Sequence, residues 1–370
     1  MIEPVADRWG APTYEPPYGE WPPSIPIRLL GGERVLHIAL RDAATHEAQP
    51  ALERALRRLG CSGYAEVDWA ALGAEKAREA VRIACRELCP TIIFAQIQTG
   101  GVFDPLDVAE WRRHMPPEGV IIQWNGDLRE LASHPSMAWQ VALGRVMDAT
   151  LVTNTNDPEW LAAQGVPGAG YLQIGYDPVI YDPNAPPAEN YPFAVFLGSN
   201  YQTLGYDAPL RAELAEKLYV ALDGDFGCYG FAWEGPWANP RVLQHEEAPI
   251  YRGAELAVGL SLHNDIARYT SDRTFRALGS GAVYAIKRFP DMDGLGLVDG
   301  GNCWVWDTVD DLVKLVKEYW DEREEEGFFL GRYNMRESAY RLAVEHHTWD
   351  VRMGELAAIV LDIRRRRAVG

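Results

Sequence analysis

Apolar segments alternate with segments of helical periodicity along most of the chain. Residues 34–40 form the first strand candidate, and Leu52, Leu56 and Leu59 then recur at helical spacing. The same alternation predicts strands at residues 64–69, 91–97, 120–124, 149–153 and 171–174, and helices at residues 47–59, 74–88, 105–114, 137–147 and 158–164. Apolar strands separated by helices are typical of a parallel sheet that is covered on both faces.

A second alternation of the same kind follows residues 181–191, a proline-rich segment without periodicity. Residues 332–367 are mainly helical in pattern, with a break near His346 and Thr348. Strands are expected at residues 193–197, 227–231, 256–262, 282–287 and 303–306, and helices at residues 209–222 and 309–320 and after Ser271. The predicted fold class is α/β, with two doubly wound, Rossmann-like domains facing a cleft.

These patterns also predict the domain boundaries. Residues 1–30 are rich in proline, tyrosine and tryptophan and are expected to form an extended arm. The remaining parts are an N-terminal domain at residues 31–180, a linker at 181–191, a C-terminal domain at 192–348 and a terminal helix at 349–370.

Composition supports two soluble domains. A length of 370 residues is typical of two domains, and 47% hydrophobic with 24% charged residues is ordinary for a globular protein. No apolar run reaches the roughly 20 residues that span a bilayer, and the five cysteines are scattered, so a cytoplasmic protein that does not bind membranes is expected. The net charge of −18 argues against a protein whose whole surface is built to hold nucleic acid or anionic lipid, while a local basic groove stays open.

Residues 269–287, with the sequence YTSDRTFRALGSGAVYAIK, are the most informative segment. Ser271 is a helix-capping residue type, and Asp272, Arg273 and Thr274 follow it at the predicted start of a helix. A helix start with an arginine is suited to a phosphate ester. The alternative is a structural helix in which Ser271 is only a cap and Arg273 forms an ion pair.

Two loops after predicted strands of the C-terminal domain add polar candidates. Gly198, Ser199 and Asn200 follow one strand, and Asn264 follows another. Glycine lets a backbone approach a phosphate closely, although an ordinary turn uses the same residue types. Ligands of open α/β sheets bind beyond the carboxyl ends of the strands, where these loops lie.

In the N-terminal domain, the segment WNGDLR places Asp127 and Arg129 after a predicted strand. Asp127 is a candidate to accept a proton, and His46, after the first strand, is a weaker candidate base. Alternatively, Asp127 caps the next helix or pairs with Arg129, and His46 is a surface histidine. The Walker, GxGxxG and GxSxG patterns are absent from their usual positions, so typical nucleotide hydrolases, NAD enzymes and serine hydrolases lack support.

A succession of five segments in the C-terminal half resembles a known family. The segments read FLGSN, SLHN, SDRTFRALGSGA, NCWVWDTVDDLVK and HHTWDVRMGEL. Their order and spacing resemble the donor-binding half of GT-B glycosyltransferases, and within that fold the spore-maturation-protein-like (CgeB-like) group. The segments WNGD and LVTN are similar to the acceptor half of that group. The resemblance extends over most of residues 34–360.

The resemblance implies that the C-terminal domain binds a nucleoside diphosphate sugar and that the terminal helix returns to the N-terminal domain. The sugar, a hexose or pentose, would move from its nucleotide, with UDP expected, to a hydroxyl acceptor. The group needs neither a metal nor a tightly bound cofactor, because helix dipoles and basic side chains neutralise the leaving diphosphate. The residues expected around the nucleotide are Gly198, Ser199, Asn200, Asn264, Ser271, Asp272, Arg273 and Thr274.

Arg273 would stabilise the leaving group under this interpretation. For inversion at the sugar, Asp127 is the first candidate for the base and His46 the second, whereas retention needs no base there. One departure from the family pattern is Arg276, which stands where many retaining members of the fold have a glutamate. The carboxylate that binds the ribose would then be absent or moved, with Asp272 as the alternative.

The acceptor stays open: a small molecule, a glycan, a protein or a modified DNA base. A phage-type enzyme that glycosylates hydroxymethylated DNA bases is one alternative, against which the acidic charge weighs. A nucleotide-sugar epimerase and a non-catalytic binding module of the same fold also stay open, because a fold by itself does not specify an activity.

Overall fold

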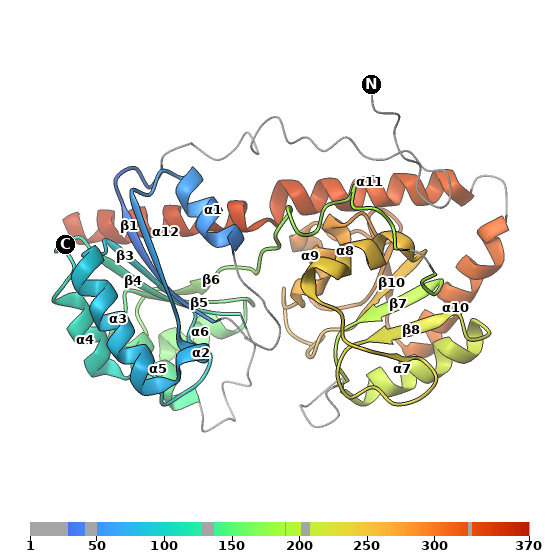
Figure 1. Cartoon of the computed structure of the whole chain (residues 1–370), viewed down its shortest axis with the longest axis horizontal. Helices are drawn as coiled ribbons and strands as arrows, with labels where there is room; N and C mark the ends of the chain where they lie inside the picture. The colour runs from blue at the N-terminus through green and yellow to red at the C-terminus, as the bar shows by residue number, and fades with distance from the viewer. Residues whose placement is uncertain are drawn as a thin grey trace. The chain divides into compact units, whose positions relative to one another are not determined.

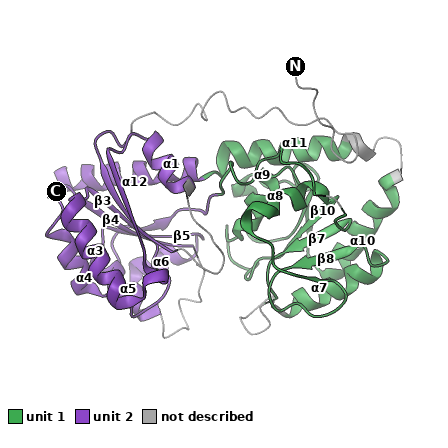
Figure 2. Cartoon of the chain, viewed as in Figure 1, with its two compact units in different colours: residues 1–21, 176–348 green, residues 22–175, 349–370 purple. Residues whose placement is uncertain are grey.

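The computed structural model describes residues 29–40, 50–126, 137–188, 190–200, 208–324 and 328–369. These residues form two compact units (Figures 1 and 2). Described residues up to 175, together with residues from 349 onward, form the N-terminal unit, and residues 176–348 form the C-terminal unit.

The N-terminal unit contains a six-stranded parallel sheet in the order β2-β1-β3-β4-β5-β6. Its strands are β1 (Arg34–Ala39), β2 (Gly63–Asp68), β3 (Ile92–Ala95), β4 (Val120–Asn125), β5 (Ala149–Val152) and β6 (Ala169–Tyr171). Its helices are α1 (Pro50–Arg58), α2 (Trp69–Leu72), α3 (Ala74–Leu88), α4 (Pro105–Arg112), α5 (Ala138–Gly144), α6 (Asp157–Ala163) and α12 (Trp349–Val369).

Both faces of this sheet are covered, as the apolar strands predict. Phe94 of β3 packs with Leu52 of α1 and Met353 of α12, whereas Ile93 packs on the opposite face with Trp111 of α4. Consecutive strand residues point to opposite faces, so a strand buried on both sides is apolar at every position.

The C-terminal unit contains a second six-stranded parallel sheet, in the order β12-β11-β10-β7-β8-β9. Its strands are β7 (Ala194–Leu197), β8 (Phe226–Tyr229), β9 (Ala238–Asn239), β10 (Leu256–Gly259), β11 (Tyr284–Lys287) and β12 (Trp304–Trp306). Its helices are α7 (Ala208–Ala221), α8 (Gln244–Gly253), α9 (Asp272–Gly279), α10 (Val309–Asp321) and α11 (Phe328–His346), with 3-10 turns η2 (Asp293–Leu295) and η3 (Glu322–Glu324). The predicted pair of doubly wound sheets is confirmed.

Several details differ from the sequence-based expectations, including the short elements α2 and β9, which were not predicted. The strand expected at residues 256–262 ends at Gly259, and the following residues form a loop. The strand expected at residues 171–174 lies earlier, at Ala169–Tyr171. Helix α8 was not predicted, because it contains Pro249 and has no apolar periodicity.

The chain passes from one unit to the other at residues 175–176 and again at residues 348–349. The backbone N–H of Tyr176 donates to the carbonyl of His347 at 3.0 Å, and Tyr176 forms a parallel bridge with Thr348. The His347 ring stacks on Phe275 of α9 with centroids 4.0 Å apart. The predicted break near residue 346 is therefore the connection between α11 and α12.

Within the described residues, the structure has no helix that is long and apolar enough to cross a membrane.

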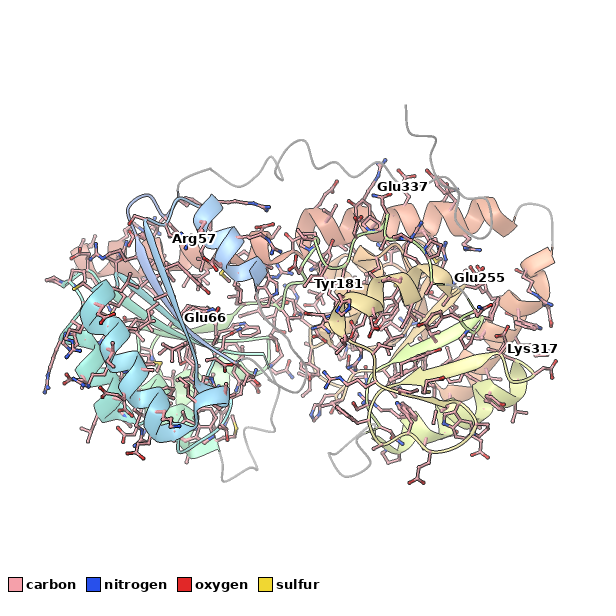
Figure 3. All side chains as sticks on the ribbon, in the orientation of Figure 1. Arg57, Glu66, Tyr181, Glu255, Lys317 and Glu337 are labelled. Atoms are coloured by element: carbon pink, nitrogen blue, oxygen red, sulfur yellow. The ribbon has the colours of Figure 1, made fainter. Side chains whose placement is uncertain are left out.

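A buried ion pair joins α11 to the start of β10. Arg332 pairs with Glu255, and their side chains are only 3% and 2% exposed. By contrast, Lys317 and Asp321 on α10 form an exposed pair at 3.7 Å. Figure 3 labels both Glu255 and Lys317.

We expect Arg332→Met to lower the free energy of unfolding of the C-terminal unit by about 3–5 kcal/mol, because it removes the guanidinium from a buried carboxylate. Urea unfolding followed by circular dichroism measures this change. The control Lys317→Met removes an exposed pair and should cost no more than about 1 kcal/mol. Equal losses in the free energy of unfolding for Arg332→Met and Lys317→Met would contradict the prediction that the buried pair stabilises the unit more than the exposed pair.

Candidate functional site

Three segments meet beyond the carboxyl ends of the strands of the C-terminal sheet. They are residues 198–200 after β7, residues 260–264 after β10, and the start of α9. The backbone N–H of Ser271 donates to the Ser261 hydroxyl at 3.0 Å, and Arg273 donates to the carbonyl of Leu260 at 3.4 Å. The strand order places β7 and β10 side by side, so the loops that follow them are neighbours.

Ser271 is the N-cap of α9. Its backbone is extended, with φ −68° and ψ 149°, and its hydroxyl accepts from the backbone N–H of Arg273 at 3.4 Å. Thr274 lies deeper, and its buried hydroxyl is 2.7 Å from that of Thr270. The predicted cap is confirmed, and the Thr274 hydroxyl is already hydrogen-bonded inside the unit.

Gly198 makes room for Arg273. It has a φ of +150°, and a Cβ added there would lie 3.0 Å from the guanidinium carbon of Arg273. A side chain at this position would press on the guanidinium, and the positive φ would strain any residue other than glycine. The Arg273 guanidinium carbon lies 5.9 Å from the centroid of the Phe196 ring at the end of β7.

Arg211 of α7 holds two of the three segments together. It is fully buried, and its guanidinium donates to the carbonyl of Ser199 and, at 3.2 Å, to the carbonyl of Leu260. Arg211 is not recognisable from the sequence, because within the helix it has the same spacing as ordinary surface charges. Only its contacts in the folded chain distinguish it.

The two arginines of α9 differ in their partners. Arg276 pairs with Asp272 at 2.5 Å and with Glu247 of α8 at 3.5 Å. Arg273 is partly exposed and has no carboxylate within 4.0 Å among the residues that the structure describes. An anion that approaches the start of α9 therefore finds a guanidinium that forms no ion pair with a described carboxylate.

Asp272 is ionised at neutral pH. Burial alone would raise the pKa of its carboxyl, but Arg276 and Arg273 lower it more, with help from the Ser271 hydroxyl. The result is a pKa below the ordinary value of 3.8. Glu247 accepts a hydrogen bond from the Tyr181 hydroxyl at 2.6 Å, so this second carboxylate is also held in place (Tyr181 is labelled in Figure 3).

The other predicted polar residues have different surroundings. Asn264 is buried and its side-chain amide donates to the carbonyl of Ser261 at 3.0 Å, which closes the loop after β10. The hydroxyl of Ser199 accepts from the backbone N–H of Phe231 at 3.1 Å. Asn200 is 3% exposed, and its Oδ1 has no hydrogen-bond partner in the described part of the chain. This loop thus contains a buried acceptor atom without a described partner.

Phe231, after β8, is a further feature that the sequence analysis missed. It is 54% exposed, and the guanidinium carbon of Arg241 lies 4.9 Å from its ring centroid. The backbone N–H of Asn200 donates to the carbonyl of Phe231 at 2.9 Å, which places the backbone of Phe231 beside the glycine loop. An exposed aromatic face can stack on a planar ligand group.

The two candidate bases lie outside the described residues. Asp127 and His46 fall in residues 127–136 and 41–49. Asn125, just before, is buried, and its amide donates to Gln140 of α5 at 3.2 Å. In the part of the chain that the structure describes, no group of three or more His, Cys, Asp or Glu side chains is arranged to hold a metal ion.

Two of the three segments of the site, residues 260–264 and the start of α9, lie in a region with a family match. Residues 210–358 match the family model described as "Glycosyl transferase-like". The whole chain is similar in fold to sucrose-phosphate synthase from Thermosynechococcus elongatus, with 11% sequence identity, a TM-score of 0.55, and coverage of 91% of this chain and 100% of that one. This chain has the GT-B fold.

Two further structures share this fold. A glycosyltransferase from Rickettsia africae has 6% identity and a TM-score of 0.54, with coverage of 90% of this chain and 98% of that one. S. aureus TarM, in complex with fondaparinux, alpha-GlcNAc-glycerol and UDP, has 8% identity and a TM-score of 0.52, with coverage of 77% and 59%. A sequence search of curated proteins found no match.

We expect Asp272 to stabilise the C-terminal unit in a pH-dependent way. Its lowered pKa means that the stabilisation is fully present above the ordinary value of 3.8 and is lost as the pH falls below it through the lowered pKa. Asp272→Asn should therefore show a smaller loss of stability between neutral and acidic pH than the unmodified protein. Thermal unfolding across this pH range measures the difference.

Asp307→Asn is the control for this measurement, because Asp307 forms an exposed pair with Arg288 at 2.9 Å. It should leave the acid profile close to that of the unmodified protein. Identical profiles for Asp272→Asn and the unmodified protein would contradict the prediction.

Proposed function

We propose that this protein is a glycosyltransferase that moves a sugar from a nucleoside diphosphate, with UDP as the expected nucleotide, to a hydroxyl acceptor. The observation that supports it most directly is Arg273. It is partly exposed at the start of α9, lacks a described carboxylate partner and lies against the backbone of Gly198. The family match over residues 210–358 and the GT-B fold support the same conclusion.

In this proposal, the sugar nucleotide binds with its diphosphate at the start of α9. Sugar transfer breaks the bond between the anomeric carbon and the diphosphate oxygen, which leaves additional negative charge on the phosphate. The Arg273 guanidinium and the positive end of the α9 dipole stabilise that charge as it develops. The TarM structure of similar fold contains UDP, which fits a uridine nucleotide as the leaving group.

Residues 198–200 and 231 would surround the rest of the nucleotide. The exposed face of Phe231 offers a stacking surface for a nucleobase, and the unpartnered Oδ1 of Asn200 can accept a hydrogen bond from a base or sugar N–H or O–H. Asp272 is engaged by Arg276, so a ribose hydroxyl would share that carboxylate with the guanidinium.

The acceptor would be bound by the N-terminal unit. If the sugar is transferred with inversion, a base must take the proton of the acceptor hydroxyl, and we assign this role to Asp127, with His46 as the second candidate. The identity of the acceptor depends on loops of the N-terminal unit, which the fold does not specify.

We expect Arg273→Gln to weaken the binding of UDP about 10- to 100-fold, because hydrogen bonds to charged groups contribute roughly 1.5–3 kcal/mol each. Isothermal titration calorimetry with UDP measures the change, and a UDP-dependent rise in Tm provides a second readout. Inorganic diphosphate should show the same loss, because the interaction is with the phosphates.

Arg288→Gln is the matched control. Arg288 pairs with the exposed Asp307 at 2.9 Å, and its replacement by glutamine changes the net charge by the same amount as Arg273→Gln. It should leave the UDP affinity within about threefold of the unmodified protein. Binding of UDP that is unaffected by Arg273→Gln would overturn the proposed site.

Asp127→Asn separates the two steps of the proposed reaction. We expect it to abolish transfer to the acceptor while slow hydrolysis of the UDP-sugar, measured as UDP release without acceptor, continues. His46→Gln tests the second candidate in the same assays. Unchanged transfer in both variants would rule out both residues as the base.

A further inference from the structure

We propose that Arg276 is a positioning residue that keeps Arg273 available for the diphosphate by neutralising Asp272. This inference rests on the proposed function, since it concerns the same site. It also gives a role to the arginine that departs from the family pattern.

Asp272 and Arg273 are neighbours at the start of α9, and the charge of Arg273 helps to lower the pKa of the Asp272 carboxyl. Asp272 nevertheless pairs with Arg276, one turn further along the helix, through its Oδ2 at 2.5 Å. Its Oδ1 accepts from the Ser271 hydroxyl at 3.0 Å. The Asp272 side chain thus pairs with the guanidinium of Arg276, and not with that of Arg273.

Arg276 is itself held from two sides. Glu247 of α8 lies 3.5 Å from its guanidinium, and the Tyr181 ring lies 5.3 Å from the guanidinium carbon. The Tyr181 hydroxyl donates to the same Glu247 oxygen at 2.6 Å. These contacts fix the guanidinium of Arg276 beside Asp272.

The side chains of this cluster are largely shielded from water, with 11% exposure for Arg276, 15% for Glu247 and 25% for Asp272. Charges interact more strongly in such surroundings than at the surface. Without Arg276, Asp272 and Glu247 would both lose the guanidinium that they share. Arg273 would then be the cation next in sequence to Asp272. Asp272 would then compete with the diphosphate for Arg273 and would repel the diphosphate directly.

A purely structural role for Arg276 predicts something different. In that case its loss would weaken packing between α8 and α9, and removal of the Asp272 charge would not restore ligand binding. A rescue experiment therefore distinguishes positioning from structure.

The experiment measures the affinity for inorganic diphosphate by calorimetry, because this probe lacks ribose and base. We expect Arg276→Gln to weaken binding about 10-fold or more, a change typical of a lost charged interaction. The double variant Arg276→Gln/Asp272→Asn should recover to within about threefold of the unmodified protein. Full affinity of Arg276→Gln, or a double variant as weak as the single one, would overturn the proposal.

The matched control is Arg276→Gln/Glu247→Gln, which also replaces a carboxylate by an amide beside Arg276. It leaves Asp272 charged next to Arg273 and should therefore stay weak. Equal rescue by both double variants would show that net charge, and not the Asp272 contact, sets the affinity, and would overturn the proposal.

Asp272→Asn alone covers the case in which Arg276→Gln fails to fold. It should bind diphosphate at least as tightly as the unmodified protein, and a loss of 10-fold or more would overturn the proposal. Failure of the site itself is distinguishable, because Arg273→Gln would then leave diphosphate binding unchanged. Loss with Arg273→Gln but no rescue by Asp272→Asn would refute only the positioning role.

Discussion

Charge balance around the start of α9 is the constraint on which the candidate site depends. Asp272, Arg273 and Arg276 lie within five consecutive residues, and Glu247 of α8 contacts the same group. Partly buried charges persist only when they are paired and hydrogen-bonded. Arg276 meets this requirement for both carboxylates, whereas the Arg273 guanidinium has no described carboxylate within 4.0 Å. The same balance explains why an arginine at position 276 is compatible with an anion site.

The backbone around this charge is equally constrained. Gly198 leaves the space that the Arg273 guanidinium occupies, and Arg211 ties the loops after β7 and β10 through their carbonyls. A side chain at position 198 would press on the Arg273 guanidinium. A shorter residue at position 211 would lose the hydrogen bonds that join the two loops. Pre-organised charges of this kind stabilise a leaving group without rearrangement during the reaction. The candidate site is therefore formed by residues of the C-terminal unit by itself.

Elements with a strong local pattern were predictable from the sequence. The apolar strands, the helices between them, the Ser271 cap and the break before Trp349 all depend on neighbours within a few residues. Helix α8 was not predictable in this way, because Pro249 interrupts its pattern and its stability comes from packing. The strand expected at residues 256–262 was predicted too long. Residues 260–262 are Leu, Ser and Leu, which continue the strand pattern although the pairing in the sheet ends before them.

The sequence by itself determined two parallel sheets and a capped helix with an arginine at its start, because periodicity and capping are local properties. The tertiary structure decided which charges pair. Glu247 is 29 residues from Arg276 and 66 residues from Tyr181, yet contacts both. Spacing along a chain contains no record of such contacts, since they arise only when the sheet brings distant segments together. For this reason Arg276 looked like a missing carboxylate in the sequence and is an ion-pair partner of two carboxylates in the folded protein.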